Sequence, residues 1–219
     1  MILTRELVVQ RLTQERARGV RGDRRRSNED AQETAYREED RNPFVRGDRP
    51  LKPAAVLVPL VDRGMDGLTV LLTRRTDHLS NHGGQISFPG GRCDPGDPDC
   101  VATALRETEE EVGIARRHIT IVGELDDYIV GTGYLVRPVV GIVQPPFDLT
   151  PHDHEVAEIF EAPLDFIADP ANLQRHSRTA DGVKRDHFAI PWGDYYIWGA
   201  TAGMLRNLSE LLWLSADVE

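Results

Sequence analysis

The chain has 219 residues and carries 36 Asp and Glu against 26 Lys and Arg, which gives a formal net charge of −10. Its 40% hydrophobic and 28% charged residues are typical of a folded domain and exclude a disordered or fibrous chain. A domain this acidic is a poor partner for nucleic acid or an anionic membrane, so a phosphate-bearing ligand needs a metal ion or a local arginine cluster.

Cysteine usage and apolar runs indicate a cytoplasmic protein. The two cysteines, Cys93 and Cys100, match no zinc pattern and cannot build a disulfide framework, so we interpret both as packing residues. The longest apolar run, residues 53–61, is too short to cross a bilayer. The N-terminus carries charge too early for a signal peptide. We therefore expect no membrane partner.

The first fifty residues differ in character from the rest. Residues 3–18 space their apolar side chains as a helix does. Residues 19–50 are polar and mixed in charge, which favours a solvated arm or a short helix at 30–39. We therefore divide the chain into a helix with an arm, residues 1–50, and a main domain, residues 51–219. The arm either packs on that domain or forms a dimer contact, so a monomer and a homodimer both remain open.

The main domain mixes strands and helices. The pattern predicts strands at 54–61, 68–73, 119–125, 134–143 and 186–190. It predicts a loop at 78–91, a strand followed by a helix at 155–167, and helices ending at Val112 and Leu214. Asp97 and Asp99 are candidate N-caps of the first helix, and Gly113 ends it. Because strands and helices do not alternate strictly, we expect an α+β fold with a sheet layered between helices.

The helix that ends at Val112 carries an acidic face. Four of its residues fall in one stripe that we expect to face the core: Val101, Leu105, Thr108 and Val112. Glu107, Glu110 and Glu111 lie on one face roughly opposite, at positions i, i+3 and i+4. Three carboxylates there repel one another unless a cation lies among them, and Mg²⁺ prefers such oxygen ligands. The alternative is a solvent-exposed acidic face.

At these residues the sequence resembles a known family. Residues 106–114, Arg-Glu-Thr-Glu-Glu-Glu-Val-Gly-Ile, resemble the second half of the Nudix box, R-E-U-x-E-E-x-G-U, with Thr108 at an aliphatic position. In the first half of the box, Gly91 and Asp97 lie one residue further from Arg106 than the box requires. This departure leaves the role of Asp97 open and does not touch the three glutamates.

A second motif is similar to that of the coenzyme A pyrophosphatase branch of the family. Residues 71–91, which end in Phe-Pro-Gly-Gly, resemble the motif upstream of the box in that branch, and residues 155–164 and 197–202 are also similar to it. The resemblance runs from about residue 52 to the C-terminus. It implies a Nudix-type α/β/α sandwich with a mixed β-sheet. It also implies that Mg²⁺ or Mn²⁺ supports hydrolysis of coenzyme A, or of its acyl or oxidised forms, to 3′,5′-ADP and 4′-phosphopantetheine.

The resemblance also implies residue roles. Glu107 and Glu111 would be metal ligands, Glu110 would be a third ligand or the general base, and Arg106 would pair with Glu110 or steady a neighbouring loop. Candidate substrate contacts lie just upstream: Arg74, Arg75, His82, Gly90 and Gly91. Each has an alternative, namely an ion pair with a carboxylate for either arginine, a structural role for the histidine and a simple turn for the glycines.

Other polar and aromatic groups receive plainer interpretations. We interpret Glu155 as a capping or solvated residue, although a facing loop could supply it to a metal. The aromatic residues between Trp192 and Trp198 are expected to pack in the core or an interface, with adenine stacking as the alternative. The competing functions are a Nudix hydrolase for another dinucleotide, such as NADH or ADP-ribose, and a non-catalytic nucleotide-binding sensor module.

Overall fold

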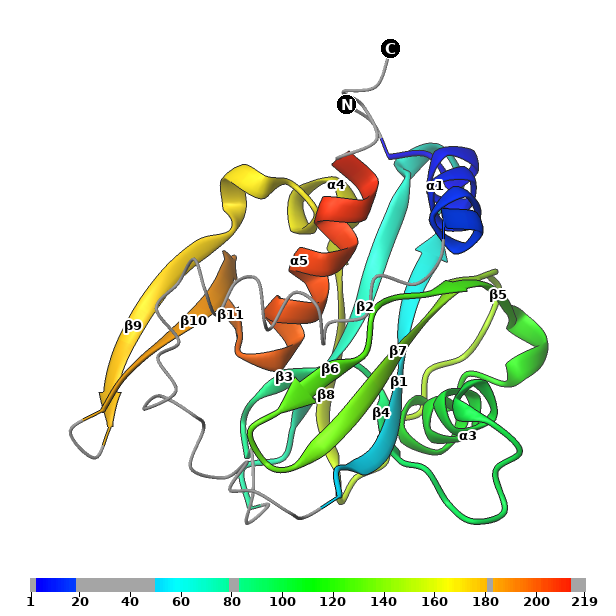
Figure 1. Ribbon diagram of the computed structural model, residues 1–219. Helices are drawn as coiled ribbons and strands as arrows, with labels where there is room; N and C mark the ends of the chain where they lie inside the picture. The colour runs from blue at the N-terminus through cyan, green and yellow to red at the C-terminus, as the bar shows by residue number, and fades with distance from the viewer. Residues whose placement is uncertain (1–2, 19–49, 79–82, 181–182, 214–219) are drawn as a thin grey trace.

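The computed structural model describes residues 3–18, 50–78, 83–180 and 183–213 (Figure 1). Its helices and 3-10 turns (η) are α1 (Arg5–Arg18), η2 (Gly64–Asp66), α3 (Cys100–Val112), η3 (Arg116–His118), α4 (Leu164–Ile167), η4 (Pro170–Asn172) and α5 (Ala200–Trp213). Its strands are β1 (Lys52–Asp62), β2 (Leu68–Arg75), β3 (Ile86–Ser87), β4 (Gly90–Arg92), β5 (Ile119–Glu124), β6 (Tyr128–Val130), β7 (Tyr134–Val143), β8 (Val156–Pro163), β9 (Gln174–Ala180), β10 (Val183–Trp192) and β11 (Tyr195–Trp198). The arm proposed for residues 19–50, with its short helix, lies almost wholly outside the described residues.

A mixed eight-stranded sheet forms the centre of the fold. Its main path is β3-β2-β1-β7-β5, with β4 paired to β1, β6 to β7 and β8 to β2. Strands β1 and β7 pair in parallel from Lys52↔Tyr134 to Val61↔Val143, and the other pairs of this sheet are antiparallel. Parallel neighbours need a crossover connection, and α3 lies within it.

Side-chain alternation along β1 explains why helices cover both faces of the sheet. Leu57 and Val61 pack with residues of α3, whereas Val58 and Leu60 belong to the larger cluster that includes α1 and α5. All four side chains are fully buried. Each contributes about 1.5–3 kcal/mol by leaving water. A strand buried on both faces requires a layer on each side, which gives the helix–sheet–helix sandwich expected from the sequence.

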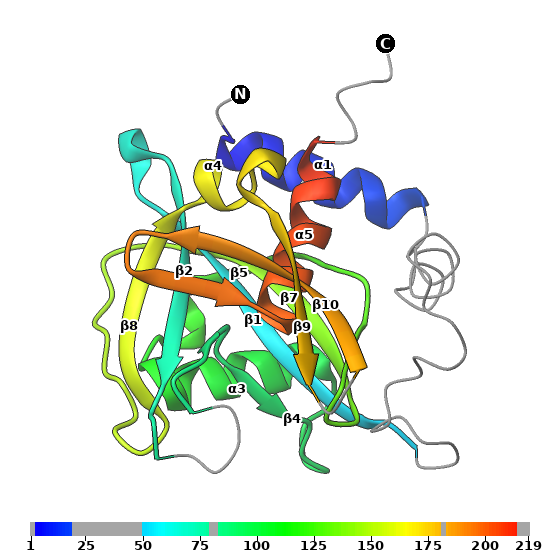
Figure 2. The same cartoon turned by 90° about the vertical axis from the view of Figure 1, so that its left-hand side faces the viewer.

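The side of the sheet opposite α3 is covered by α1, α5 and a second sheet (Figures 1 and 2). Val8 and Leu12 of α1, together with Leu3 just before it, are buried in the same cluster as the core of α5. The second sheet has the order β11-β10-β9 and is antiparallel throughout. It packs on α5 through Ile190 and Ile197, which are both buried.

Some expectations from the sequence were wrong in detail. The predicted loop at 78–91 contains β3 and the start of β4, and strands β6, β9 and β11 were not predicted. The strand expected at 186–190 extends to Val183–Trp192. Strand β9 was missed because its sequence, Gln-Arg-His-Ser-Arg-Thr-Ala, shows no apolar alternation, and its pairing with β10 supplies the order. Within the described ranges, every helix is too short or too polar to span a bilayer.

Candidate active site

Helix α3 begins and ends where its sequence predicts. The Asp99 carboxylate accepts a 2.8 Å hydrogen bond from the Ala102 N–H and caps the N-terminus. At the other end, Gly113 adopts a left-handed conformation with φ +80°, and its N–H donates to the Glu109 carbonyl. Both ends of the acidic helix are therefore held by local hydrogen bonds.

The buried face of α3 differs from the predicted stripe. Thr108 and Val112 are buried as expected, but Val101 and Leu105 are only half-buried. Glu111 is 4% exposed, so it lies on the buried side and not roughly opposite the core. Thr108 fits the aliphatic position of the motif because its hydroxyl donates to the Ala104 carbonyl at 2.7 Å.

Glu111 is a buried carboxylate with few partners. It accepts a 3.2 Å hydrogen bond from the Gly90 N–H, and the Arg75 guanidinium lies 3.9 Å from its other oxygen. Burial raises the pKa of Glu111 to about 8, and the negative charges of Glu155 and Glu107 add to the effect. A nearby cation would therefore stabilise the ionised form of Glu111.

Strand β4 brings two glycines against these carboxylates. A Cβ at Gly90 would lie 2.5 Å from the Ala55 carbonyl oxygen of β1. A Cβ at Gly91 would lie 2.5–2.7 Å from the carboxylate of Glu107. The Gly-Gly pair is therefore more than a turn, because a side chain at either position would displace β1 or the Glu107 carboxylate.

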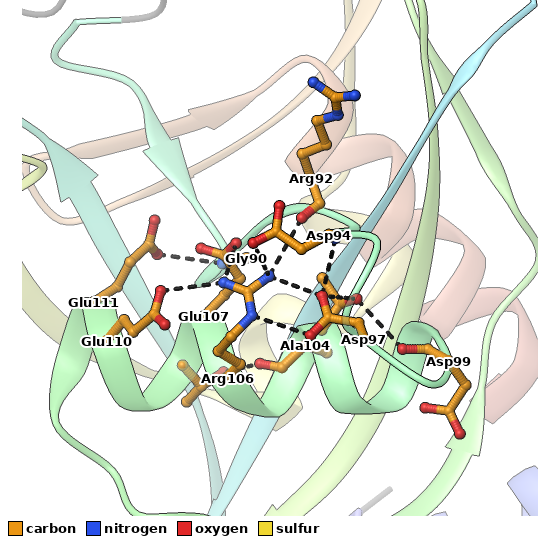
Figure 3. Close-up of polar contacts among 12 residues, drawn as sticks. Gly90, Arg92, Asp94, Asp97, Asp99, Ala104, Arg106, Glu107, Glu110 and Glu111 are labelled. Carbon is orange, nitrogen blue, oxygen red and sulfur yellow. Dashed lines mark hydrogen bonds and ion pairs between the residues drawn. The ribbon is translucent and has the colours of Figure 1, made fainter.

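Arg106 is the centre of an ion-pair network on the exposed side of α3 (Figure 3). Its guanidinium donates to both oxygens of Asp97, at 3.2 and 2.9 Å. It also donates to Glu107 at 2.9 Å and to Glu110 at 3.1 Å. The hydrogen bonds from Arg106 hold the pKa of Asp97 below its usual range. Arg106 thus links the loop before α3 to Glu107 and Glu110 of the helix.

Asp97 reaches Arg106 despite the shift in motif register. It lies in the loop before Cys100, so the additional residue is accommodated outside the helix. The Thr103 hydroxyl and the Asp94 N–H also donate to its carboxylate. The structure therefore shows that Asp97 contacts Arg106, whereas the sequence left the role of Asp97 open.

Glu155 is an acidic group for which the sequence favoured a capping or solvated role, with supply to a metal from a facing loop as the alternative. The loop before it lies against α3, because the His152 N–H donates to the Glu111 carbonyl at 2.9 Å. The charge of Glu155 acts to raise the pKa of both Glu107 and Glu111. The loop is fixed where it meets β2, because the Glu155 carbonyl accepts from the Thr76 N–H at 3.0 Å. The available signal was an acidic and histidine-rich segment, residues 152–155, directly before a predicted strand.

Glu107, Glu111 and Glu155 are the candidate ligands for a divalent cation. Glu107, Glu111 and Glu155 act on one another electrostatically, and burial raises the pKa of Glu107 as well as that of Glu111. A cation beside them would favour the ionised forms. Among the described residues, no three acidic, histidine or cysteine side chains already converge with metal-ligand spacing. Ligation therefore requires carboxylate rotation, and Glu107 is at present bonded to Arg106.

The two predicted phosphate-binding arginines lie on opposite faces of the sheet. Arg75 faces α3 and Glu111. Arg74 pairs with Glu158 at 3.2 Å, and the Tyr195 hydroxyl donates to the same carboxylate at 2.6 Å. His82 lies outside the described residues.

The aromatic residues near the C-terminus pack mainly on one another and on the core. The rings of Phe160 and Tyr195 stack with centroids 3.8 Å apart, and Trp192 stacks on Tyr195 at 5.6 Å. All three pack against the main hydrophobic cluster. These contacts support the packing interpretation for Trp192 and Tyr195.

Comparison with known proteins identifies the family. The NUDIX domain model matches residues 51–181. A protein named Uncharacterized Nudix hydrolase NudL, from Yersinia pestis (strain Pestoides F), is 38% identical over 157 residues, which are 72% of this chain and 78% of that protein. NudL from Yersinia pseudotuberculosis serotype O:1b (strain IP 31758) gives the same values.

Two solved structures were also matched. A binary complex of C. elegans Ap4A hydrolase has a TM-score of 0.44 and 24% identity, over 51% of this chain and 80% of that chain. The MutT protein from Methanosarcina mazei Go1 has a TM-score of 0.42 and 23% identity, over 55% and 82% of the two chains. From the domain match over residues 51–181 and the similarity to NudL, the chain belongs to the Nudix hydrolase family, enzymes that act on nucleoside diphosphate derivatives and generally need divalent cations.

Proposed function

We propose that this Nudix hydrolase cleaves the diphosphate linkage of coenzyme A, or of its acyl or oxidised forms, to 3′,5′-ADP and 4′-phosphopantetheine or its derivative. One observation carries the proposal: the segment that resembles the coenzyme A branch, residues 71–91, touches the carboxylates of α3. Arg75 from this segment lies 3.9 Å from Glu111, and the Gly90 N–H donates to the same carboxylate. A segment in this position is able to select the substrate at the reacting bond.

The carboxylates divide into two groups by burial. Glu111 and Glu107 are the shielded pair, and with Glu155 they would hold Mg²⁺ or Mn²⁺. A cation held by these residues would supply neutralisation of charge on the diphosphate and a lower pKa for a water molecule. Glu110 is 57% exposed, and rotation away from Arg106, to which it is now bonded, would bring it toward the site as a further ligand or as the base that accepts the proton from water. Arg106 orients Glu107 and Glu110, and Asp97 holds Arg106.

The surrounding groups fit an anionic substrate. Arg75 is partly exposed beside the carboxylates, where its planar guanidinium can bind a phosphate through two hydrogen bonds. Because Gly91 has no side chain, the backbone of β4 can lie close to the Glu107 carboxylate. Arg74, on the other face of the sheet beside Tyr195, would bind a part of the substrate remote from the reacting bond. His82 stays a predicted contact.

The ligand is a small molecule and not a nucleic acid. The net charge is −10, and a duplex or long RNA would need a continuous basic surface. A short diphosphate needs only a cation and one or two arginines, which the carboxylate site and Arg75 supply.

The test is product analysis with purified protein. Coenzyme A, NADH and ADP-ribose are each incubated with Mg²⁺ or Mn²⁺, and the products are separated by chromatography, with Glu107→Gln as the inactive control. We expect 3′,5′-ADP from coenzyme A as the fastest product. Faster cleavage of NADH or ADP-ribose would replace the substrate assignment. Binding of coenzyme A in calorimetry without turnover with either metal would instead identify a sensor module.

A further inference from the structure

The two cysteines of the chain lie against each other beside the active site. Their sulfur atoms are 4.0 Å apart, and both are free thiols that are neither fully buried nor fully exposed. Cys93 directly follows β4, the strand of Gly90 and Gly91, and Cys100 is the first residue of α3. The pair therefore joins the two segments that build the carboxylate site.

The surroundings keep the thiols close and distinguish their roles. Both side chains pack on an apolar cluster that includes Leu57 and Val139 from adjacent strands. Burial raises the pKa of Cys100 to about 11, the Cys93 sulfur adds to the effect, and the charge of Arg137 opposes it. Cys100 is therefore a neutral thiol at physiological pH.

The loop between the cysteines contains a residue that orients the site. Asp97 lies at its centre and holds Arg106 through two hydrogen bonds, at 3.2 and 2.9 Å. Arg106 in turn holds Glu107 at 2.9 Å. Any change in the span from Cys93 to Cys100 is thus transmitted to a carboxylate of the proposed metal site.

We propose that Cys93 and Cys100 form a reversible disulfide under oxidation by hydrogen peroxide, and that this bond lowers turnover. The Cys93 thiolate attacks the peroxide oxygen, the O–O bond breaks, and hydroxide leaves and becomes water. The resulting Cys93 sulfenic acid is attacked by the Cys100 sulfur, which forms the S–S bond, while the Cys100 proton and the sulfenic hydroxyl leave as a second water. Two thiols are oxidised and one peroxide is reduced.

The expected loss of turnover follows from the length of the disulfide bond. A disulfide brings the sulfurs from 4.0 Å to about 2.05 Å, so the ends of the loop approach or their side chains rotate. Displacement by about 1 Å at an active site lowers rates by up to about a hundredfold. We expect at least a fivefold loss of turnover in the oxidised protein.

The test measures thiols and turnover on the same sample. The full chain is treated with hydrogen peroxide, and acetyl-coenzyme A, whose thiol is blocked, serves as substrate. We expect a mass decrease of about 2 Da, loss of both titratable thiols, a peptide linking Cys93 and Cys100, and recovery of activity with dithiothreitol. Cys93→Ser and Cys100→Ser should retain basal activity. Peroxide should cause in these variants no loss of activity that dithiothreitol reverses.

Several outcomes would overturn the proposal. They are persistence of both free thiols, linkage between two chains in place of one, and a disulfide that leaves turnover unchanged. If one serine variant folds poorly, Cys93→Ala replaces it, with thermal unfolding as the check. Mass and thiol count do not depend on the substrate, and any nucleotide that the protein cleaves can report turnover, so failure on coenzyme A alone leaves this inference standing.

Discussion

Replacing Glu111 with Gln should stabilise the metal-free protein while removing its activity. Glu111 is 4% exposed, and its carboxylate has one hydrogen bond, from the Gly90 N–H, and one arginine, Arg75, at 3.9 Å. Burial raises the pKa of Glu111 to about 8, against 4.5 in an unfolded chain. A glutamine side chain keeps the carbonyl that accepts from Gly90 and has no charge to desolvate.

The magnitude depends on pH. Between pH 4.5 and about 8 the folded protein holds a proton on Glu111 that the unfolded chain has released. The contribution of Glu111 to stability is therefore fully present below pH 4.5 and is lost as pH rises toward 8. The loss is about 1.4 kcal/mol per pH unit, which totals about 3–5 kcal/mol. Glu111→Gln should show no such loss.

The assay is denaturant unfolding of both proteins in EDTA at several pH values. The difference in free energy of unfolding should be small at pH 5 and favour the variant by a few kcal/mol at pH 8. Glu109→Gln, on an exposed side chain of the same helix, is the control and should change stability by less than about 0.5 kcal/mol. Parallel pH curves for wild type and Glu111→Gln would refute the reasoning.

Three further variants or treatments probe the same site. Gly91→Ala should lower kcat about tenfold or more with little change in melting temperature, because its Cβ would displace the flexible Glu107 carboxylate. The matched control is Gly96→Ala, which has open space around it. Equal kcat values for the two variants would contradict the argument. Glu107→Gln should reduce kcat at least about a hundredfold and change the free energy of unfolding by less than about 1 kcal/mol in denaturant titration. EDTA should abolish turnover and excess Mg²⁺ should restore it, and activity that survives chelation would exclude the proposed metal role.

Sequence reasoning succeeds where a local rule decides the structure. The Asp99 cap and the Gly113 stop of α3 follow from residue chemistry at single positions, and both are observed. Strands β1 and β7 are recognisable because burial on both faces leaves a nearly continuous apolar run.

It fails where tertiary contacts override the local pattern. A helical wheel places Glu111 away from the apolar stripe, but β4 approaches the helix so closely at Gly90 that the carboxylate is enclosed. Likewise, the sequence does not tell which partners Arg74 and Arg75 meet on the two faces of the sheet. Adjacent strand residues alternate, yet which face receives the substrate depends on elements far away in the chain.

The parallel pairing of β1 with β7 has a consequence for how the protein is made. Partner residues in this ladder, such as Lys52 and Tyr134, are about 80 positions apart, and α3 lies between them. Closing so long a segment is entropically costly and slows folding. While β7 is still inside the ribosome, every glutamate of α3 has already been synthesised. It lacks the neighbour that completes the sheet beneath them, so catalytic competence should arise late in synthesis.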